Sequence, residues 1–321
     1  MSAPFVIDAL QFVRPSRVVF EEMRAGGVVA AHMTVSYHEG FQATAEALSA
    51  WNREFEAHSD LILRGTHAED IDRARETRRT AIFFGAQNPA PIGDDIGLVE
   101  VVHQLGLRFM QLSYNNQSLL CAGCYEREDS GLTNMGHEVV AEMNRVGLVI
   151  DMSHSGDRSR REAIEASERP IAITHANPAS WHNVPRNVQP DTLKALAESG
   201  GMLGFSLYPL HLSGGSDCTL EAFCTMVART AEELGVAALG IGSDLCQGQS
   251  ASALTWMRDG RWRKERTPVE AFPDQPEFFR TNADFPGIAQ GLREVGFDEG
   301  EVHAILGGNW YRFFKESFEP R

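Results

Sequence analysis

Short apolar runs alternate along the chain with amphipathic stretches of helical character. Eight runs are rich in aliphatic or β-branched residues and have the length of buried strands: 5–12, 27–35, 80–85, 107–113, 147–153, 170–175, 201–208 and 238–243. A weaker ninth run, 60–64, is either an extra strand or the passage from a helix into a loop. Strands that alternate with helices are typical of a parallel sheet with crossover connections. Because eight such strands close a barrel, the pattern predicts an α/β fold of the (β/α)8, or TIM-barrel, type.

Several helices are marked by the spacing of their apolar residues and by their end signals. Between 136 and 146 the apolar residues share one face and the charged residues occupy the other. The stretch 190–199 begins with Pro190 and is followed by a glycine, which are favoured residues at the start of a helix and just past its end. Two further helices are expected at 286–296 and 299–318.

The segment 246–285 shows neither helical nor strand periodicity. Its aromatic residues stand among proline, aspartate and arginine: Trp256, Trp262, Phe272, Phe278 and Phe279. Long loops in compact chains are usually functional or lie at interfaces, so we expect a lid or a homodimer contact here. The whole chain, 1–321, is expected to form a single domain with this loop as an excursion.

Composition and charge exclude several classes of protein. The 321 residues include 29 Lys and Arg against 44 Asp and Glu, which gives a formal net charge of -15. Nucleic-acid binding requires clustered basic residues, and the one basic cluster, 258–266, is short and is interpreted as a solvated loop. No segment approaches the roughly 20 apolar residues that cross a bilayer, and the first residues lack a secretory signal pattern. We expect a cytoplasmic protein, without a membrane partner, that acts on a small molecule.

Five cysteines are too few for a disulfide scaffold, and an odd number fits a reducing compartment. Cys121 and Cys124 form the only close pair in the sequence. Two thiolates alone cannot complete a four-ligand structural zinc site. The pair is therefore interpreted as ordinary thiols in a loop, with a redox pair or a local disulfide as alternatives.

Polar residues at the carboxyl ends of barrel strands are the candidates for chemistry, because active sites of this fold lie there. His154 follows the strand 147–153, His175 ends the strand 170–175, and Asp244 follows the strand 238–243. Singly, each has a structural explanation: a hydrogen-bonded histidine, or a carboxylate that caps a helix. Together they suit a divalent metal ion, with a carboxylate able to move protons.

Two further residues suit a small anionic substrate. Arg186 follows His175 by 11 residues, and a guanidinium can hold a carboxylate through two parallel hydrogen bonds. Tyr114 follows the strand 107–113 and could donate a hydrogen bond to a developing oxyanion. Taken separately, each is interpreted first as a surface or packing residue.

Five segments together resemble the membrane (renal) dipeptidase family of zinc peptidases, and the likeness extends from about residue 5 to 316. The segments are DMSHSGD, RPIAITHAN, VPRN, GIGSDLCQG and LGGNWYRFF. The resemblance implies an amidohydrolase-like barrel whose family members hold two zinc ions bridged by a glutamate. By position it implies that His154 and His175 bind the second metal, that Asp244 handles protons, and that Arg186 holds the substrate carboxylate.

The chain departs from the family where the first metal would bind. The family's His-x-Asp motif on the first strand is matched by Leu10 and Phe12, its bridging glutamate by Gln87, and its substrate-side histidine by Tyr114. Leu10 and Phe12 would fill the first-metal pocket with hydrocarbon if the strand keeps its period of two. A neutral amide is a weak replacement for a bridging carboxylate. We therefore expect one zinc ion per chain, or none, in place of two, with Gln87 and Tyr114 on the substrate side.

One metal ion could be held by His154, His175 and Asp244. His32 and His38 are possible replacement ligands, although His32 is interpreted first as a hydrogen-bonded core histidine.

Three functions remain open at this level. The first is a metal-dependent hydrolase of a dipeptide or related N-acyl amino acid with a free carboxylate. The second is an isomerase, lyase or tautomerase that needs only Asp244 or a histidine for proton transfer and Arg186 as an anchor. The third is a silent binder of a small amino-acid-like ligand.

Overall fold

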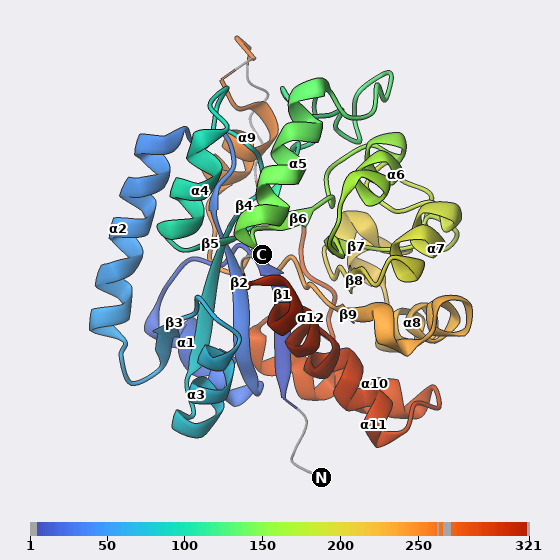
Figure 1. Cartoon of the computed structure of the whole chain (residues 1–321). Helices are drawn as coiled ribbons and strands as arrows, with labels where there is room; N and C mark the ends of the chain where they lie inside the picture. Colours follow the sequence, from blue (N-terminus) through green and yellow to red (C-terminus); the bar gives the residue numbers. More distant parts are fainter. Residues whose placement is uncertain (1–4, 262, 266–270, 320–321) are drawn as a thin grey trace.

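The fold is a closed barrel of parallel strands surrounded by helices (Figure 1). The computed structural model describes residues 5–261, 263–265 and 271–319. Eight strands close the barrel in the order β1-β2-β4-β5-β6-β7-β8-β9, and β9 pairs back with β1. Their bounds are β1 Val6–Gln11, β2 Val28–Ser36, β4 Thr80–Ala86, β5 Leu107–Gln111, β6 Val149–Asp151, β7 Ala172–Ala176, β8 Met202–Phe205 and β9 Leu239–Ile241. All eight predicted strands are confirmed.

The weak ninth run is a short extra strand, β3 (Ile62–Arg64). It pairs in parallel with the first residues of β4, from Thr80 to Ile82, whereas β5 pairs with β4 only from Phe84 onward. β3 therefore pairs with the amino-terminal part of β4, and β5 pairs with its carboxyl-terminal part. β3 is not a ninth strand of the closed barrel.

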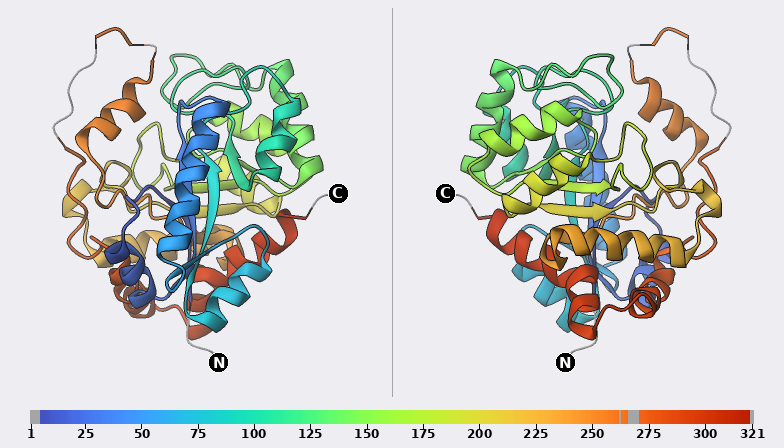
Figure 2. Two further views of the ribbon diagram at one scale, coloured as in Figure 1. Left: turned by 90° about the vertical axis from the view of Figure 1, so that its left-hand side faces the viewer. Right: turned by 90° about the vertical axis from the view of Figure 1, so that its right-hand side faces the viewer.

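Helices connect the strands and form the outer layer. Their bounds are α1 Arg17–Ala25, α2 Phe41–Ala57, α3 Glu69–Thr77, α4 Gly97–Gln104, α5 Asn134–Val146, α6 Asp157–Ala166, α7 Pro190–Glu198, α8 Leu220–Leu234, α9 Ala251–Asp259, α10 Phe285–Glu294, α11 Glu299–His303 and α12 Asn309–Ser317. Short 3-10 turns occupy Pro209–His211, Gly215–Asp217, Val236–Ala238 and Asn282–Asp284. Figure 2 shows α9 and the C-terminal helices at opposite ends of the barrel.

The core has two parts, as expected for a barrel wrapped by helices. One part lies between the strands and the helices, and the other fills the barrel interior. In the interior, Phe83 and Phe109 from the strands pack against Phe314 of α12, with ring centroids 5.4 and 5.3 Å apart. Trp310 of α12 is fully buried and donates from its ring nitrogen to the Ile241 carbonyl at 3.0 Å. These aromatic side chains close the amino-terminal end of the barrel and leave the carboxyl end for a site.

The predicted helix 299–318 is interrupted, which corrects the sequence interpretation. One π-helical turn, Ala304–Gly308, separates α11 from α12. The backbone of Gly307 passes so close to Phe5 that a Cβ atom would lie 2.6 Å from the Phe5 carbonyl oxygen. The wider turn accommodates this contact between the C-terminal segment and the start of β1.

The expectation of an irregular, aromatic-rich loop over 246–285 is also wrong in part. Residues 251–259 form α9, whose first turn is capped by Ser250 through the amide of Ala253. Phe279 is fully buried, and in the described part of this segment no large hydrophobic side chain is strongly exposed. The aromatic residues therefore pack inward, which removes the argument from exposure for a dimer contact. Trp262 lies outside the described residues.

Candidate active site

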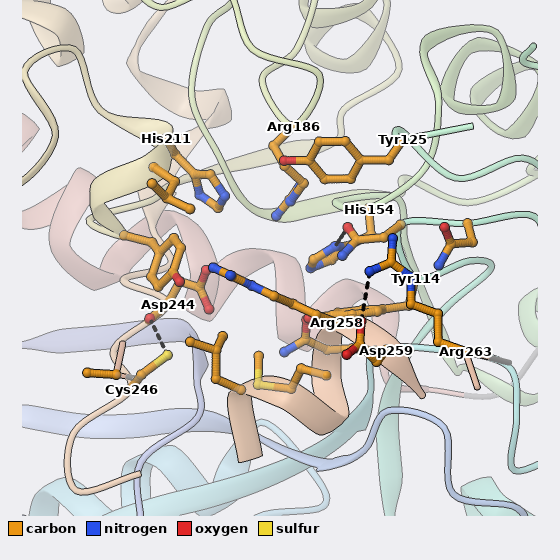
Figure 3. A pocket seen from close by; sticks show the side chains of 18 residues that line it. Tyr114, Tyr125, His154, Arg186, His211, Asp244, Cys246, Arg258, Asp259 and Arg263 are labelled. Carbon is orange, nitrogen blue, oxygen red and sulfur yellow. Dashed lines mark hydrogen bonds and ion pairs between the residues drawn. The ribbon is translucent and has the colours of Figure 1, made fainter. Parts of the chain in front are cut away.

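A cavity of about 850 Å³ opens at the carboxyl ends of the strands (Figure 3). Its lining includes five of the residues predicted from the sequence: Gln87, Tyr114, His154, Arg186 and Asp244. The sixth, His175, is fully buried directly behind His154. Residues that come from strand ends far apart in the sequence therefore share one site, as the barrel geometry requires.

The two histidines form the best-defined pair in the cavity. His154 is 6% exposed and His175 is not exposed, and their Nε2 atoms lie 3.0 Å apart. Burial is the main cause that moves the pKa of both imidazoles well below the usual range, and the nearby Arg186 charge lowers them further. Both rings are therefore neutral, which is the form that binds metal ions.

The proton of His175 is located by a chain of hydrogen bonds. The Thr174 hydroxyl donates to Oδ2 of Asp151 at 2.6 Å, so its oxygen must accept from Nδ1 of His175 at 2.8 Å. Asp151 also accepts from the Ser153 hydroxyl and from the backbone amides of Ser153 and Thr174. His175 is thus fixed as the Nδ1–H tautomer with its Nε2 lone pair directed at His154.

The proton of His154 is placed in the same way. Its Nδ1 lies 2.7 Å from Oδ1 of Asn115, which only accepts hydrogen bonds, so Nδ1 carries the hydrogen. Nε2 of His154 is then also an unprotonated lone pair. Two lone pairs at 3.0 Å repel each other unless a cation lies between or beside them. This donor set fits one metal ion held by His154 and His175.

A larger metal centre does not fit the described residues. Within 5–261, 263–265 and 271–319 no group of three or more His, Cys, Asp or Glu side chains could hold a metal ion. This is a correction to the expectation that Asp244 would be a third protein ligand.

The residues that the resemblance matches to the family's first-metal ligands make other contacts. Phe12 packs edge-on against Tyr37, with ring centroids 4.9 Å apart, and Leu10 is fully buried. Gln87 donates from Nε2 to the hydroxyls of Thr34 at 2.8 Å and Tyr37 at 3.1 Å. The surroundings of Phe12 and Gln87 are therefore neutral, hydrogen-bonded and aromatic, whereas a second metal ion would need charged ligands.

The other candidate histidines are not placed as replacement ligands. His32 lies inside the barrel, stacked on Phe109 at a centroid distance of 4.3 Å, and its Nδ1 contacts the Ala9 carbonyl at 2.6 Å. His38 contacts the Met257 carbonyl at 3.1 Å through Nε2. Neither belongs to the cavity lining. The interpretation of His32 as a core histidine agrees with its burial.

Asp244 follows β9 and faces the cavity in an unusual backbone conformation. Its φ of 56° lies in the left-handed region, which is uncommon for residues other than glycine and often marks functional positions. Its amide donates to the Leu10 carbonyl at 3.0 Å, and the preceding Ser243 bonds to the buried carboxylate of Asp8. Burial raises the pKa of Asp244 to about 7, although the charge of Arg186 opposes this.

Two buried arginines, Arg186 in the cavity lining and Arg160 next to it, have no carboxylate partners among the described residues. Arg186 donates to the backbone carbonyls of Ser153 and His175, and its Nε has no partner. Arg160 is also buried and bonds only to backbone carbonyls, among them those of Met152 and Arg186. Among the described residues neither guanidinium lies within ion-pair distance of an acid. The floor of the cavity is therefore positively charged.

The sequence profile of the membrane dipeptidase family (Peptidase family M19) matches residues 13–255. The chain belongs to this family. It is 23% identical over 283 residues, 87% of its length, to Dipeptidase tcpJ of Claviceps purpurea. The chain spans 61% of the length of that relative and 47% of Dipeptidase 3 from Mus musculus.

Solved structures extend the likeness to nearly the whole chain. An amidohydrolase from Pseudomonas aeruginosa is 36% identical, with a TM-score of 0.94 over 98% of this chain and 97% of that one. A metallo peptidase from Rhodobacter sphaeroides, liganded with a phosphinate mimic of the dipeptide L-Ala-D-Ala, is 16% identical with a TM-score of 0.82 over 98% and 100%. The Pseudomonas aeruginosa structure supports a close relation to this chain, and the Rhodobacter sphaeroides structure shows that the two proteins share a fold. The family includes metallopeptidases, so it implies a metal ion.

Despite the family's name, no helix in the described part of the chain is both long and apolar enough to span a bilayer. Cys121 and Cys124 carry free thiols, and burial raises the pKa of both.

Some cavity residues escaped the sequence analysis. Tyr208 and His211 follow β8, and their place just after a barrel strand is the signal that marks them as candidates. His211 contacts the Ser206 hydroxyl at 2.8 Å through Nδ1. Arg258 and Arg263 belong to the basic cluster interpreted as a solvated loop, yet both line the cavity. Only the folding of α9 back over the barrel reveals them.

Proposed function

We propose that this chain is a dipeptidase-like metallohydrolase that cleaves a dipeptide or related N-acyl amino acid with a free carboxylate. The observation that carries the proposal is the convergence of two unprotonated Nε2 atoms, a proton-accepting carboxylate and an unpaired guanidinium on one cavity. Membership of the membrane dipeptidase family supports the same reaction class.

His154 and His175 would hold one zinc-type ion in this proposal. Bound there, such an ion would polarise the scissile carbonyl and make water a better nucleophile near neutral pH. The chain's own residues supply the remaining requirements of amide hydrolysis: a base, an oxyanion donor and a substrate anchor.

Asp244 is proposed as the proton carrier. With a pKa near 7, its carboxylate can accept a proton from the attacking water, and its carboxylic acid can return that proton to the leaving nitrogen. Among the described residues no hydrogen bond to its side-chain oxygens is found, so they are available to the reacting groups.

Tyr114 and Arg186 are proposed as substrate-binding residues. The ring of Tyr114 lies over His154 at a centroid distance of 4.1 Å, and burial raises the pKa of its phenol well above 10, so the hydroxyl remains a donor. It would stabilise the negative charge that develops on the carbonyl oxygen. The guanidinium of Arg186, which lines the cavity and has no acidic partner among the described residues, would hold the substrate carboxylate. Gln87 would contact the substrate from the wall beside Tyr114.

The test is release of free amine from a panel of dipeptides and N-acetyl amino acids, supplied as racemates, by the zinc-loaded chain. Tyr114→Phe serves as a matched variant because it removes only the hydroxyl. We expect turnover by the wild type and a fall in kcat of about 10- to 1000-fold in Tyr114→Phe with a smaller change in KM. No amine release from any member of the panel by folded, zinc-loaded protein would refute the proposal.

A further inference from the structure

The outer part of the cavity carries a charge pattern that general amide hydrolysis does not require. Besides Arg186, the cavity is lined by Arg258 and Arg263, while its lining acids are Asp244 and Asp259. Asp259 pairs with Arg263, with 3.3 Å between Oδ1 and the guanidinium nitrogen. Among the described residues, the guanidinium groups of Arg186 and Arg258 therefore face one carboxylate that is in no ion pair, that of Asp244. The cavity thus carries an excess of positive charge, although the formal net charge of the whole chain is -15.

Arg258 is directed into the cavity by the helix that carries it. In α9, Leu254, Met257 and Arg258 are spaced three and four residues apart, which places them on one face, and all three line the cavity. The Arg258 side chain runs across the cavity in the view of Figure 3. Its guanidinium lies close enough to the hydroxyl of Tyr208, beyond β8, to lower the pKa of that phenol against the effect of burial.

Arg258 has no acidic partner in the part of the chain that the structure describes. It also lies beyond residue 255, where the match to the family profile ends. Arg258 is thus a cavity-lining residue distinct from the histidine pair and from Arg186. A guanidinium that lines a cavity without a counter-charge is a site for an anionic group of the ligand.

We propose that Arg258 is a specificity-determining residue that selects ligands with a second carboxylate, so that the preferred substrates are dianionic N-acyl amino acids. One carboxylate would be held on the Arg186 side and the other between Arg258 and the hydroxyl of Tyr208. An unmodified dipeptide carries an ammonium group, which Arg258 would repel and for which Asp244 is the one lining acid outside an ion pair among the described residues. This inference rests on the proposed function for the identity of the substrate class, but its test does not require turnover.

The test measures ligand affinity by calorimetry on the full chain with two pairs of racemic sulfonamides, which resemble N-acyl amino acids but resist hydrolysis. The first pair, N-methanesulfonyl-glutamate and N-methanesulfonyl-glutamine, differs by one charge on the amino acid side chain. The second pair, N-(2-carboxyethanesulfonyl)-alanine and its carboxamide, differs by one charge on the acyl side. We expect the charged member to bind about tenfold more tightly or better in at least one pair.

Variants assign the preference to Arg258. In Arg258→Gln the preference should vanish, and in Arg258→Lys a part of it should remain because the charge is kept without the planar fork. Arg261→Gln is the matched control, since it removes the same charge from a residue of this segment that does not line the cavity and lies over the ring of Trp256. It should keep the full preference.

Two results would overturn the inference: equal affinities within both pairs for the wild type, or an unchanged preference in Arg258→Gln. Failure of the proposed hydrolysis looks different. In that case the sulfonamides would still be discriminated through Arg258, while no amide in the turnover panel would be cleaved.

Discussion

The Nε2 atoms of His154 and His175 face each other at 3.0 Å, while the opposite nitrogen of each ring has its proton committed to Asn115 or Thr174. Such a pair is electrostatically incomplete without a cation. No comparable arrangement surrounds Leu10, Phe12 and Gln87 in the described structure, where neutral groups satisfy one another. The described residues of the cavity thus offer a histidine pair suited to one cation and no comparable pair for a second.

Metal content should follow from this asymmetry. We expect elemental analysis of protein purified without chelator to give about one divalent ion per chain, and the His154→Ala, His175→Ala double variant to lose it. His32→Ala is the matched control and should retain the metal. Two ions per wild-type chain would show that the first-strand region has been interpreted wrongly.

Replacement of Asp244 by asparagine keeps its shape but removes the base. We expect turnover to fall by orders of magnitude while ligand binding survives. In the wild type, kcat should rise with pH through about 7, because the group must be ionised to accept a proton. This limb of the pH profile should be absent from the residual activity of the variant. An unchanged rate in Asp244→Asn would exclude the assigned role.

The Asp244→Asn substitution should raise the stability of the folded chain, although it lowers turnover. Burial raises the pKa of Asp244 from 3.8 in the unfolded chain to about 7, so the wild type loses stability as pH rises between these values. The metal-free Asp244→Asn chain lacks this loss. Chemical denaturation should therefore show equal stability near pH 4 and a more stable variant above pH 7, by up to about 4 kcal/mol. A variant that is no more stable at pH 8 would contradict the buried, raised pKa.

Thr174 should act as a positioning residue for the metal site. Thr174→Val preserves shape but breaks the hydrogen-bond chain from Asp151 to His175, so the ring loses its fixed tautomer. We expect zinc affinity to fall about 10- to 100-fold, measured by competition with a chelator. Thr174→Ser keeps the hydroxyl and should restore most of the affinity. Equal zinc affinity in the Val and Ser variants would mean that the chain of hydrogen bonds is only structural.

His32 is expected to matter for stability and not for metal binding. A Cβ atom on Gly85 would clash with the His32 ring, which is sandwiched inside the barrel against Phe109. Gly85→Ala should lower the free energy of unfolding by roughly 1–3 kcal/mol through overpacking. Denaturant unfolding measures this loss, and the metal content per folded chain should stay constant. Loss of metal in Gly85→Ala would instead connect His32 to the site.

The sequence by itself determined the barrel and part of the residues of its site. The strands of a parallel sheet are buried on both faces, so each appears in the sequence as an apolar run of strand length. All eight barrel strands could therefore be predicted from the sequence. The carboxyl ends of those strands then supplied His154, His175 and Asp244. Helix ends marked by proline and glycine were also predictable, because their backbone preferences are local.

Only the tertiary structure decided which of these groups act together. The tautomers of the two histidines depend on Asn115 and Thr174, and the raised pKa of Asp244 depends on burial; neither follows from spacing along the chain. The position of α9 escaped the sequence because nine residues between turn-rich segments carry a weak periodic signal. Arg258 lines the cavity because α9 packs over the barrel mouth, where Trp256 and Met257 contact His38, a residue more than 200 positions earlier in the chain.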